Sequence, residues 1–173
     1  MAGRLKVEDV VVRRAREADA AALADYMAGL MAERLDTISR REIPTVLEER
    51  DWILRATMVE RGMILLALAE DDVIGVLDLW AGEREDNRHA GRFGMSVARG
   101  WRGLGVGRRL LARAIDEARA WPGFCRLELE CVAWNAPAIA LYESLGFALE
   151  ARMSKAINLR GTPEDMLLMA LVW

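Results

Sequence analysis

The stretch 99-RGWRGLGVGRRLL-111 has four glycines and four arginines among its thirteen residues, and Arg113 adds a fifth arginine just beyond it. Residues 89–97 before it are strand-like, and the apolar residues after it recur at helical spacing. The start of a helix presents unpaired N–H groups and a positive dipole end, which glycines leave open to an oxyanion. With no acidic residue before Asp116, this turn predicts a polyphosphate site.

Two well-known phosphate loops do not fit this stretch. A Walker loop needs Lys followed by Ser or Thr after its last glycine, whereas Gly107 is followed by two arginines. The dinucleotide fingerprint belongs after the first strand of a βαβ unit, and here the spacing differs and the stretch comes late. The alternative is that the glycines serve only a tight turn or close packing. The arginines around them make this interpretation less favourable.

The whole composition describes an ordinary globular chain. Its 173 residues suit one domain spanning 1–173, and a net charge of −3 disfavours nucleic acid as a partner. Apolar runs such as 63–69 are too short to cross a membrane, and the N-terminus lacks a signal-like apolar run, so we expect a cytoplasmic protein. Cys125 and Cys131 form no metal-type cluster, which predicts free thiols and no metal site.

Periodicity and turn residues predict eleven elements in the order β-α-α-β-β-β-α-β-α-β-β. Thr45 and Glu48 form a capping box at the start of the second helix, and Asn135 begins the last one. The order predicts an α/β fold with a central sheet. The expected strands are 10–16, 63–70, 73–81, 89–97, 126–132, about 147–157 and 166–172, and the expected helices are 19–31, 45–59, 106–118 and 135–144.

A second motif, 135-NAPAIALYESLGF-147, follows the glycine-rich turn after one helix and one strand. The pattern Arg102-x-x-Gly105-x-Gly107 resembles the acyl-CoA pyrophosphate loop of the GNAT superfamily of N-acetyltransferases, and the second motif resembles the other hallmark of that superfamily. The segments 88-RHAGRFGMSV-97 and 159-LRGTPEDMLLMALVW-173 further resemble a bacterial subgroup that acetylates amino acids and similar small amines. The resemblance implies a GNAT fold with a mixed, mostly antiparallel sheet flanked by helices, and acetyl-CoA as co-substrate.

The resemblance also implies how the coenzyme would be held. Main-chain N–H groups of the turn would bind its pyrophosphate, β-strand-like pairing with 95–97 would hold the pantetheine arm, and an N–H near Val97 would polarise the acetyl carbonyl. Gly94 would help the strand diverge from its neighbour. Arg99, Arg109 and Arg113 stay unassigned. The coenzyme-binding residues are thus Met95, Ser96, Val97, Arg102, Gly103, Leu104, Gly105, Val106, Gly107, Arg108, Asn135, Ala138 and Tyr142.

The chemistry needs a proton donor and a proton acceptor. By resemblance, Tyr142 is the general acid at the coenzyme sulfur, although alone it would read as a packing residue on an amphipathic helix. Glu128 and Glu130 are candidate bases acting through water, or else solvated side chains on an outward face. His89 is a base or a strand-edge residue, and Cys131 is a small core thiol rather than a nucleophile.

The acceptor site is expected beside the N-terminal helices. Acidic residues there could attract a cationic amine or be ordinary loop charges, and apolar residues could shape a pocket or simply pack the core. The acidic candidates are Glu33, Asp36 and Glu42, and the apolar ones are Leu30, Met31 and Trp80.

These observations predict direct acetyl transfer, within a ternary complex, to the primary amine of a small molecule such as an amino acid. A protein N-terminus, a polyamine or an antibiotic would be alternative acceptors. A non-catalytic acyl-CoA sensor and a nucleotide-binding domain are alternatives of another class. Pairing of two copies through the C-terminal strands is expected from the prevalence of dimers.

Overall fold

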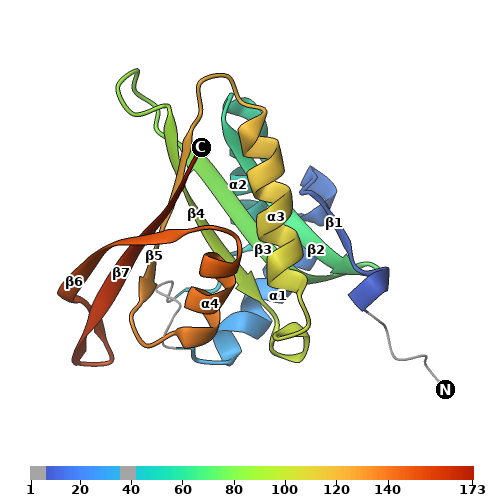
Figure 1. The fold of residues 1–173 in the computed structure, drawn as a ribbon. Coiled ribbons are helices and arrows are strands. Elements are labelled where there is room, and N and C mark those ends of the chain that lie inside the picture. The colour runs from blue at the N-terminus through green and yellow to red at the C-terminus, as the bar shows by residue number, and fades with distance from the viewer. Residues whose placement is uncertain (1–6, 36–41) are drawn as a thin grey trace.

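The computed structural model describes residues 7–35 and 42–173, and its elements follow the predicted order (Figure 1). Three short 3-10 turns, at Val7–Asp9, Glu17–Asp19 and Arg99–Trp101, were not predicted. The strands are β1 (Val11–Arg14), β2 (Gly62–Ala69), β3 (Asp72–Ala81), β4 (Ala90–Val97), β5 (Arg126–Val132), β6 (Ala148–Leu159) and β7 (Thr162–Val172). The helices are α1 (Ala20–Ala32), α2 (Val46–Met58), α3 (Val106–Arg119) and α4 (Ala136–Ser144).

The strands form one sheet in the order β1-β2-β3-β4-β5-β7-β6, in which every neighbouring pair is antiparallel except β4 and β5. This confirms the predicted α/β fold with a mixed, mostly antiparallel sheet. The parallel pairing ends where Arg92 meets Glu128. Beyond that point β4 pairs only with β3, and β5 only with β7. We call the opening between 93–97 of β4 and 129–132 of β5 the wedge.

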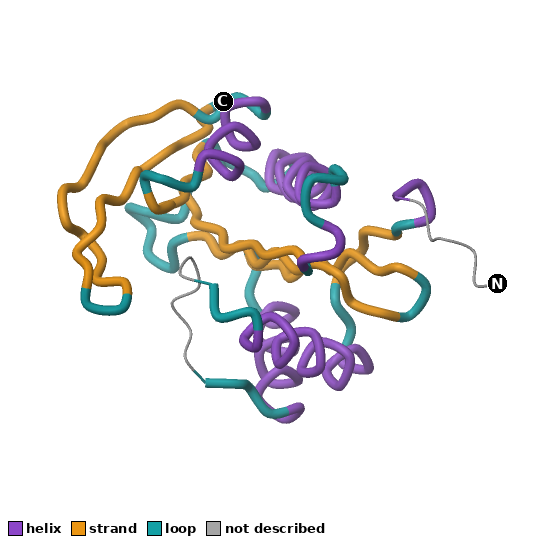
Figure 2. The backbone as a smooth tube through the Cα atoms, turned by 90° about the horizontal axis from the view of Figure 1, so that it is seen from below, coloured by secondary structure: helices purple, strands orange, loops and turns teal. Residues whose placement is uncertain are grey.

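Helices cover both faces of the sheet, with α1 and α2 on one side and α3 and α4 on the other (Figure 2). Every residue of β2 is buried as a result, which is the pattern of a strand covered on both faces. Leu65 belongs to the core under α3, while Ile64 and Leu66 belong to the core under α1 and α2. The two faces are called the α3/α4 face and the α1/α2 face below.

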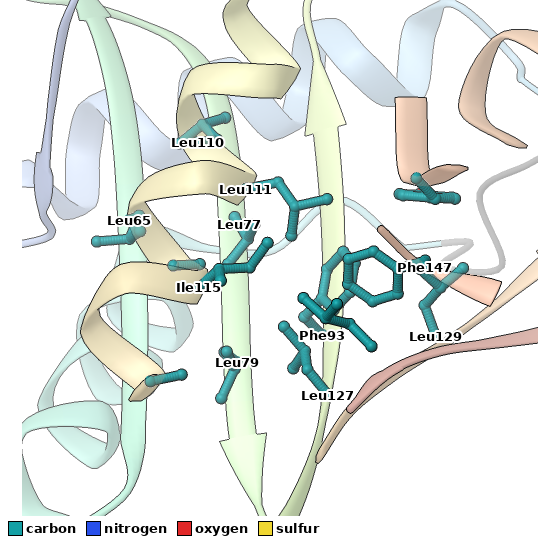
Figure 3. Close-up of a cluster of buried hydrophobic side chains, with 14 of the residues drawn as sticks. Leu65, Leu77, Leu79, Phe93, Leu110, Leu111, Ile115, Leu127, Leu129 and Phe147 are labelled. Carbon is teal, nitrogen blue, oxygen red and sulfur yellow. The ribbon is translucent and has the colours of Figure 1, made fainter. Parts of the chain in front are cut away.

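The stripe predicted for α3 is the stripe that it buries. Leu110, Leu111 and Ile115 of α3 lie in one buried cluster with Leu77 and Leu79 of β3 (Figure 3). Burying side chains of this size stabilises the fold by about 1.5–3 kcal/mol each. This packing holds the first turn of α3 in place beside β4, which is what the site requires.

The helix starts follow the predicted caps. Thr45 Oγ1 accepts the Glu48 N–H at 3.2 Å, and the Glu48 carboxylate accepts the Thr45 N–H at 2.7 Å. The Asn135 side chain accepts the Ala138 N–H at 3.4 Å and caps α4. In the two described ranges of the chain, no helix is both long enough and apolar enough to cross a bilayer.

Element ends differ from the prediction in the first and the last strand of the chain. The first strand is shorter, at Val11–Arg14 rather than 10–16. The last strand begins at Thr162 rather than 166, because the chain turns tightly at Gly161, whose φ is 89°, and pairs at once with β6. Pro163 is the second residue of this strand, and proline is tolerated near the start of a strand.

Candidate active site

A cavity of about 1000 Å³ runs from the start of α3 through the wedge to α4. It gathers most of the predicted coenzyme and catalytic residues, including Tyr142. Leu104, Val106 and Glu128 are not on its wall, and Val106 is instead fully buried in the core. The predicted residues on the wall are Met95, Ser96, Val97, Arg102, Gly103, Gly105, Gly107, Arg108, Glu130, Asn135, Ala138 and Tyr142.

The turn before α3 has the backbone shape that an anion site needs. Gly103 and Gly105 have φ values of 73° and 87°, in the left-handed region that L side chains rarely adopt. The Arg109 N–H is bonded back to the Gly105 carbonyl at 3.1 Å, so the helical ladder begins there. The N–H groups of 106–108 are therefore first-turn donors without intrahelical acceptors, and they point out of the helix start.

Gly107 has a different role from the two glycines before it. A Cβ at this position would lie 3.1 Å from the Met95 Cε and 3.3 Å from the Leu141 Cδ2. Its lack of a side chain lets the first turn of α3 pack closely between β4 and α4. The glycine-rich pattern thus combines two special backbone positions with one close approach between elements.

Arg102 is engaged within the protein. Its Nε donates to the Val97 carbonyl at 2.7 Å, and its guanidinium lies 2.7 Å from the Glu33 carboxylate. Glu33 also accepts the Arg99 N–H at 3.2 Å. Arg102 therefore ties the turn to the ends of β4 and α1, and Glu33, a candidate for attracting the amine, is already neutralised by an arginine.

Three of the other arginines of the stretch divide into two groups. Arg109 and Arg113 bond to groups away from the cavity, while Arg108 lies on the cavity wall and, within the described part of the chain, donates to a neutral hydroxyl. Arg108 is thus the guanidinium best placed to meet a pyrophosphate. The contacts are Arg108 to the Ser144 hydroxyl, Arg109 to the Val10 carbonyl and Arg113 to the Glu117 carboxylate, each at 2.7 Å.

Main-chain hydrogen bonds show which peptide groups of β4 face the wedge. The Ala90 carbonyl accepts the Gly82 N–H, and the Ala98 N–H donates to the Ile74 carbonyl, both on the side of β3. The peptide groups of even-numbered residues of β4 therefore face β3. The His89 carbonyl accepts the Cys125 N–H at 2.9 Å, on the opposite side. Since peptide groups alternate along a strand, those of residues 93, 95 and 97 face the wedge.

This alternation changes one part of the predicted coenzyme contact. Met95 and Val97 present main-chain groups to the wedge, although Arg102 occupies the Val97 carbonyl. The peptide groups of Ser96 face β3 instead, and its hydroxyl lies 2.9 Å from the Tyr26 hydroxyl. Pairing of an arm with all three residues 95–97 is therefore not available, because consecutive peptide groups point to opposite edges.

Tyr142 is buried on α4 and reaches the cavity from the α3/α4 face. Its ring meets Phe93 edge-on with centroids 5.9 Å apart and lies 6.0 Å from Phe147. Burial, helped by the neighbouring Cys131, raises the pKa of the Tyr142 hydroxyl to about 12. A hydroxyl in this state stays protonated and available as a donor across the range in which enzymes work.

The two predicted glutamates of β5 have different surroundings. Glu128 is bound by Arg92 at 2.6 Å and by Arg126 at 2.8 Å. Burial acts to raise its pKa, but the two guanidinium partners outweigh burial and leave the pKa below its usual value. Glu130 lies on the cavity wall and is 3.2 Å from Arg92. The candidate for a water-mediated base therefore narrows from the pair to Glu130.

Histidine and cysteine add no second chemistry to the cavity. His89 is exposed and is not on the cavity wall. Cys131 is on the wall, but burial raises the pKa of its thiol, which disfavours the reactive thiolate. Within 7–35 and 42–173 there is no group of three His, Cys, Asp or Glu side chains that could hold a metal ion.

The residues expected at the acceptor site are spread out. Leu30 is on the cavity wall, whereas Met31 and Trp80 pack beside the core of the α1/α2 face. Glu42 is exposed on a loop, and Asp36 lies outside the described residues.

The sequence reasoning missed Asp78, an acidic residue inside the apolar run of β3. Its Oδ2 accepts the Trp80 indole N–H at 2.8 Å, and its main chain pairs with Gly94 across β3 and β4. Burial raises the pKa of its carboxyl. A charged residue at an inward-facing position of the strand 73-VIGVLDLWA-81 was the available signal.

Comparison with known proteins supports one family. The sequence profile of the acetyltransferase (GNAT) family matches residues 27–147. The L-amino acid N-acetyltransferase AaaT of Escherichia coli (strain K12) is 32% identical over 108 residues, which are 62% of this chain and 67% of that protein. A GNAT-family acetyltransferase of Streptococcus pneumoniae superposes with a TM-score of 0.89 at 25% identity, covering 95% of this chain and 99% of its own. The ribosomal-protein-alanine N-acetyltransferase of Brucella melitensis superposes with a TM-score of 0.84 at 28% identity, covering 94% of this chain and 99% of its own.

Proposed function

The chain belongs to the GNAT family of acetyltransferases, and we propose that it transfers the acetyl group of acetyl-CoA to the primary amine of a small molecule, with L-amino acids as the leading class. The observation that carries this proposal is the cavity, which connects the N–H groups at the start of α3 with the wedge and with Tyr142. One continuous space thus offers a pyrophosphate site, an unpaired strand edge and a buried hydroxyl.

In this proposal the coenzyme lies along the cavity. Its pyrophosphate meets the first-turn N–H groups of α3 and the side chain of Arg108. The pantetheine arm pairs with the main chain of Met95 and Val97, whose peptide groups face the wedge. The Asn135 side-chain oxygen caps α4, so its amide NH₂ group is the donor toward the arm.

The chemistry is direct attack of the amine on the thioester. The Val97 N–H is the donor proposed to stabilise the oxyanion at the acetyl carbonyl. With a pKa of about 12, Tyr142 does not fully protonate a thiolate whose conjugate acid has a pKa of about 8.5. Tyr142 therefore acts by donating a hydrogen bond to the sulfur as the C–S bond breaks. Glu130, at the cavity wall, attracts the incoming ammonium.

A second acceptor class has its own support. A ribosomal-protein-alanine N-acetyltransferase resembles this chain over 94% of its length at 28% identity. The α-amine of a protein N-terminus has the same nucleophile as a free amino acid but continues into a peptide. A short alanyl peptide and free L-alanine therefore distinguish the two acceptor classes.

Calorimetry with acetyl-CoA, followed by an amine panel with detection of the released thiol, tests the proposal. The panel contains L-methionine, L-phenylalanine, L-lysine, spermidine, an aminoglycoside and an alanyl peptide, and we expect turnover of at least one free amino acid. Turnover of the alanyl peptide alone would favour the second class. Binding of acetyl-CoA without turnover of any amine would identify a sensor, and absence of binding would overturn the assignment of the cavity.

A further inference from the structure

The wedge opens at a point where two polar groups, the Tyr142 hydroxyl and the Asp78 carboxyl, lie on opposite faces of β4. The last residues paired between β4 and β5 are Arg92 and Glu128, so the opening begins at Phe93 and Gly94. Phe93 points to the α3/α4 face, where its ring meets Tyr142. Gly94 is the next residue, so a side chain at its position would point to the opposite, α1/α2 face. Both residues are on the cavity wall.

Asp78 occupies the space that the missing side chain of Gly94 leaves. A Cβ built on Gly94 would lie 3.0 Å from the Asp78 Oδ1. The other carboxylate oxygen, Oδ2, is held by the Trp80 indole N–H at 2.8 Å, which orients the group. Asp78 is half-buried and is not itself on the cavity wall, but Gly94 is, and its missing side chain leaves one oxygen of this oriented carboxyl group behind the wall where the wedge opens.

We propose that Asp78 binds the ammonium group of the acceptor and accepts its proton. This assignment rests on the proposed function and deepens it by naming the residue that converts the acceptor into a nucleophile. An acetyl group that enters the wedge at residue 93 would have Tyr142 on one side and Asp78 on the other. The amine would then approach from the α1/α2 face while the sulfur leaves toward the α3/α4 face.

Asp78 suits this role better than the carboxylates of β5. Glu128 is neutralised by two arginines, and Glu130 is 3.2 Å from Arg92. Asp78 has a neutral donor, Trp80, and burial raises the pKa of its carboxyl above the usual value, which makes it a better proton acceptor than an ordinary aspartate. The charged or titratable groups around this face include Tyr26 of α1, Glu33 directly after it, the buried Glu49 and Arg55 of α2, Arg92 of β4, Glu128 and Glu130 of β5, and Arg102.

The proton balance is complete without another reactant. Asp78 takes one proton from the ammonium, and the free amine forms the N–C bond with the acetyl carbon. The C–S bond breaks with its electron pair on sulfur, while Tyr142 donates a hydrogen bond. The surplus proton on nitrogen passes through water to the sulfur and gives the free thiol. Asp78 then releases its proton to solvent, so one proton is released per amide formed.

Asp78→Asn tests the proposal, because it keeps the shape of the side chain and an acceptor for Trp80. The measurement is kcat/KM against pH for L-methionine or, if it is better, the panel amine with the highest turnover. In the parent protein kcat/KM should be level between the pKa of Asp78 and that of the amine. Without the base only the neutral amine reacts, so kcat/KM of the variant should rise about tenfold per pH unit up to the pKa of the amine.

The expected loss at pH 7 is on the order of 10²-fold, it narrows as pH rises, and the Kd for acetyl-CoA stays unchanged. Asp72→Asn, an exposed carboxylate on the same strand, is the matched control and should leave the profile unchanged. A level profile in Asp78→Asn, or loss of the level region in Glu130→Gln alone, would overturn the assignment. An inactive parent protein would instead contradict the proposed function.

Gly94→Ala gives a second test that leaves Asp78 in the chain. Its Cβ would stand 3.0 Å from Oδ1 and cover the oxygen from the cavity, so kcat/KM for the amine should fall about tenfold or more. In the Asp78→Asn background, Gly94→Ala should lower kcat/KM much less, because both substitutions remove the same interaction. Equal losses in both backgrounds would contradict the proposed contact.

Discussion

The Arg102 guanidinium lies 2.7 Å from the Glu33 carboxylate and so joins the glycine-rich turn to the end of α1. The side chain of Glu33 is only 17% exposed, and Arg102 simultaneously donates to the Val97 carbonyl. One ion pair therefore couples three segments that lie far apart in the sequence: the end of α1, the end of β4 and the turn before α3.

Glu33→Gln should lower the free energy of unfolding by about 1–2 kcal/mol, because it removes a charge-assisted bond in a partly buried place. Urea denaturation monitored by tryptophan fluorescence measures the change. Glu17→Gln is the matched control, because its pair with Arg50 is about half exposed on both sides and should contribute less than about 0.5 kcal/mol. Equal losses in the two variants would show that Glu33 adds nothing beyond a surface ion pair.

Gly105→Glu should abolish acetyl-CoA binding, and Gly105→Ala separates the effect of charge from the effect of backbone strain. Both place a side chain at a φ of 87°, which costs about 1–2 kcal/mol. Only the glutamate adds negative charge, so its Kd should exceed that of the alanine variant at least about tenfold. Gly123→Ala, at a φ of 69° with open space around it, should share the strain and keep the affinity. Equal Kd values for the two Gly105 variants would rule out an anion at this turn.

Tyr142→Phe should lower kcat by about 10²-fold and leave the acetyl-CoA Kd within about threefold, since the hydroxyl acts on the leaving sulfur. The raised pKa of about 12 also means that the parent protein should show no loss of rate from Tyr142 ionisation up to about pH 10. Steady-state rates and calorimetry provide both measurements. Tyr26→Phe, the other buried tyrosine, should affect stability more than kcat. An unchanged kcat in Tyr142→Phe would remove Tyr142 from the mechanism.

Asp19 should make the fold sensitive to acid. Arg13 binds its carboxylate through two hydrogen bonds of 2.7 and 2.8 Å and holds its pKa below the usual value, aided by the Arg16 N–H. A lowered pKa stabilises the folded state above the unfolded pKa, and this stability is lost as pH falls through the folded pKa. Asp19→Asn should cost about 1–2 kcal/mol at pH 7, and this loss should disappear as pH falls below the folded pKa of Asp19. The exposed Asp86 is the control, and a loss independent of pH would contradict the linkage.

Asp78→Asn should have the opposite effect on stability at neutral pH. Burial raises the folded-state pKa of Asp78, so this residue lowers stability as pH rises above its unfolded pKa, and the loss is complete above the folded pKa. The asparagine variant should therefore be at least as stable as the parent at pH 7, with the difference shrinking toward pH 3. Thermal unfolding at the two pH values measures this. A large loss of stability at pH 7 would indicate that Asp78 is mainly a structural residue.

Local patterns predicted much of the architecture. The apolar residues of α3 recur at helical spacing, and all six that were predicted to share a face are buried. The capping residues Thr45 and Asn135 begin their helices as expected, because a cap depends on the next three or four residues only. Strand ends were less predictable, as β7 shows, because pairing with β6 extends the strand past Pro163.

The sequence alone was weakest for the acidic residues. Glu128 and Glu130 look equivalent on β5, but Arg92 and Arg126 surround the first, and only the second lies on the cavity wall. Asp78 interrupts an apolar strand, and its position opposite Gly94 follows only from the pairing of β3 with β4. The ionisation of each carboxyl depends on burial and on neighbours from other strands, which no local pattern reports.

By itself, the sequence determined the position of the anion-binding turn, the order of the elements and the resemblance to one acetyltransferase family. Each depends on residues close together in the chain, where conformation and dipole are local properties. Only the tertiary structure decided which peptide groups face the wedge, that Arg102 is paired with Glu33, and that the Asp78 carboxyl faces Gly94. Those relationships join strands and helices distant in sequence, so they exist only once the sheet has formed.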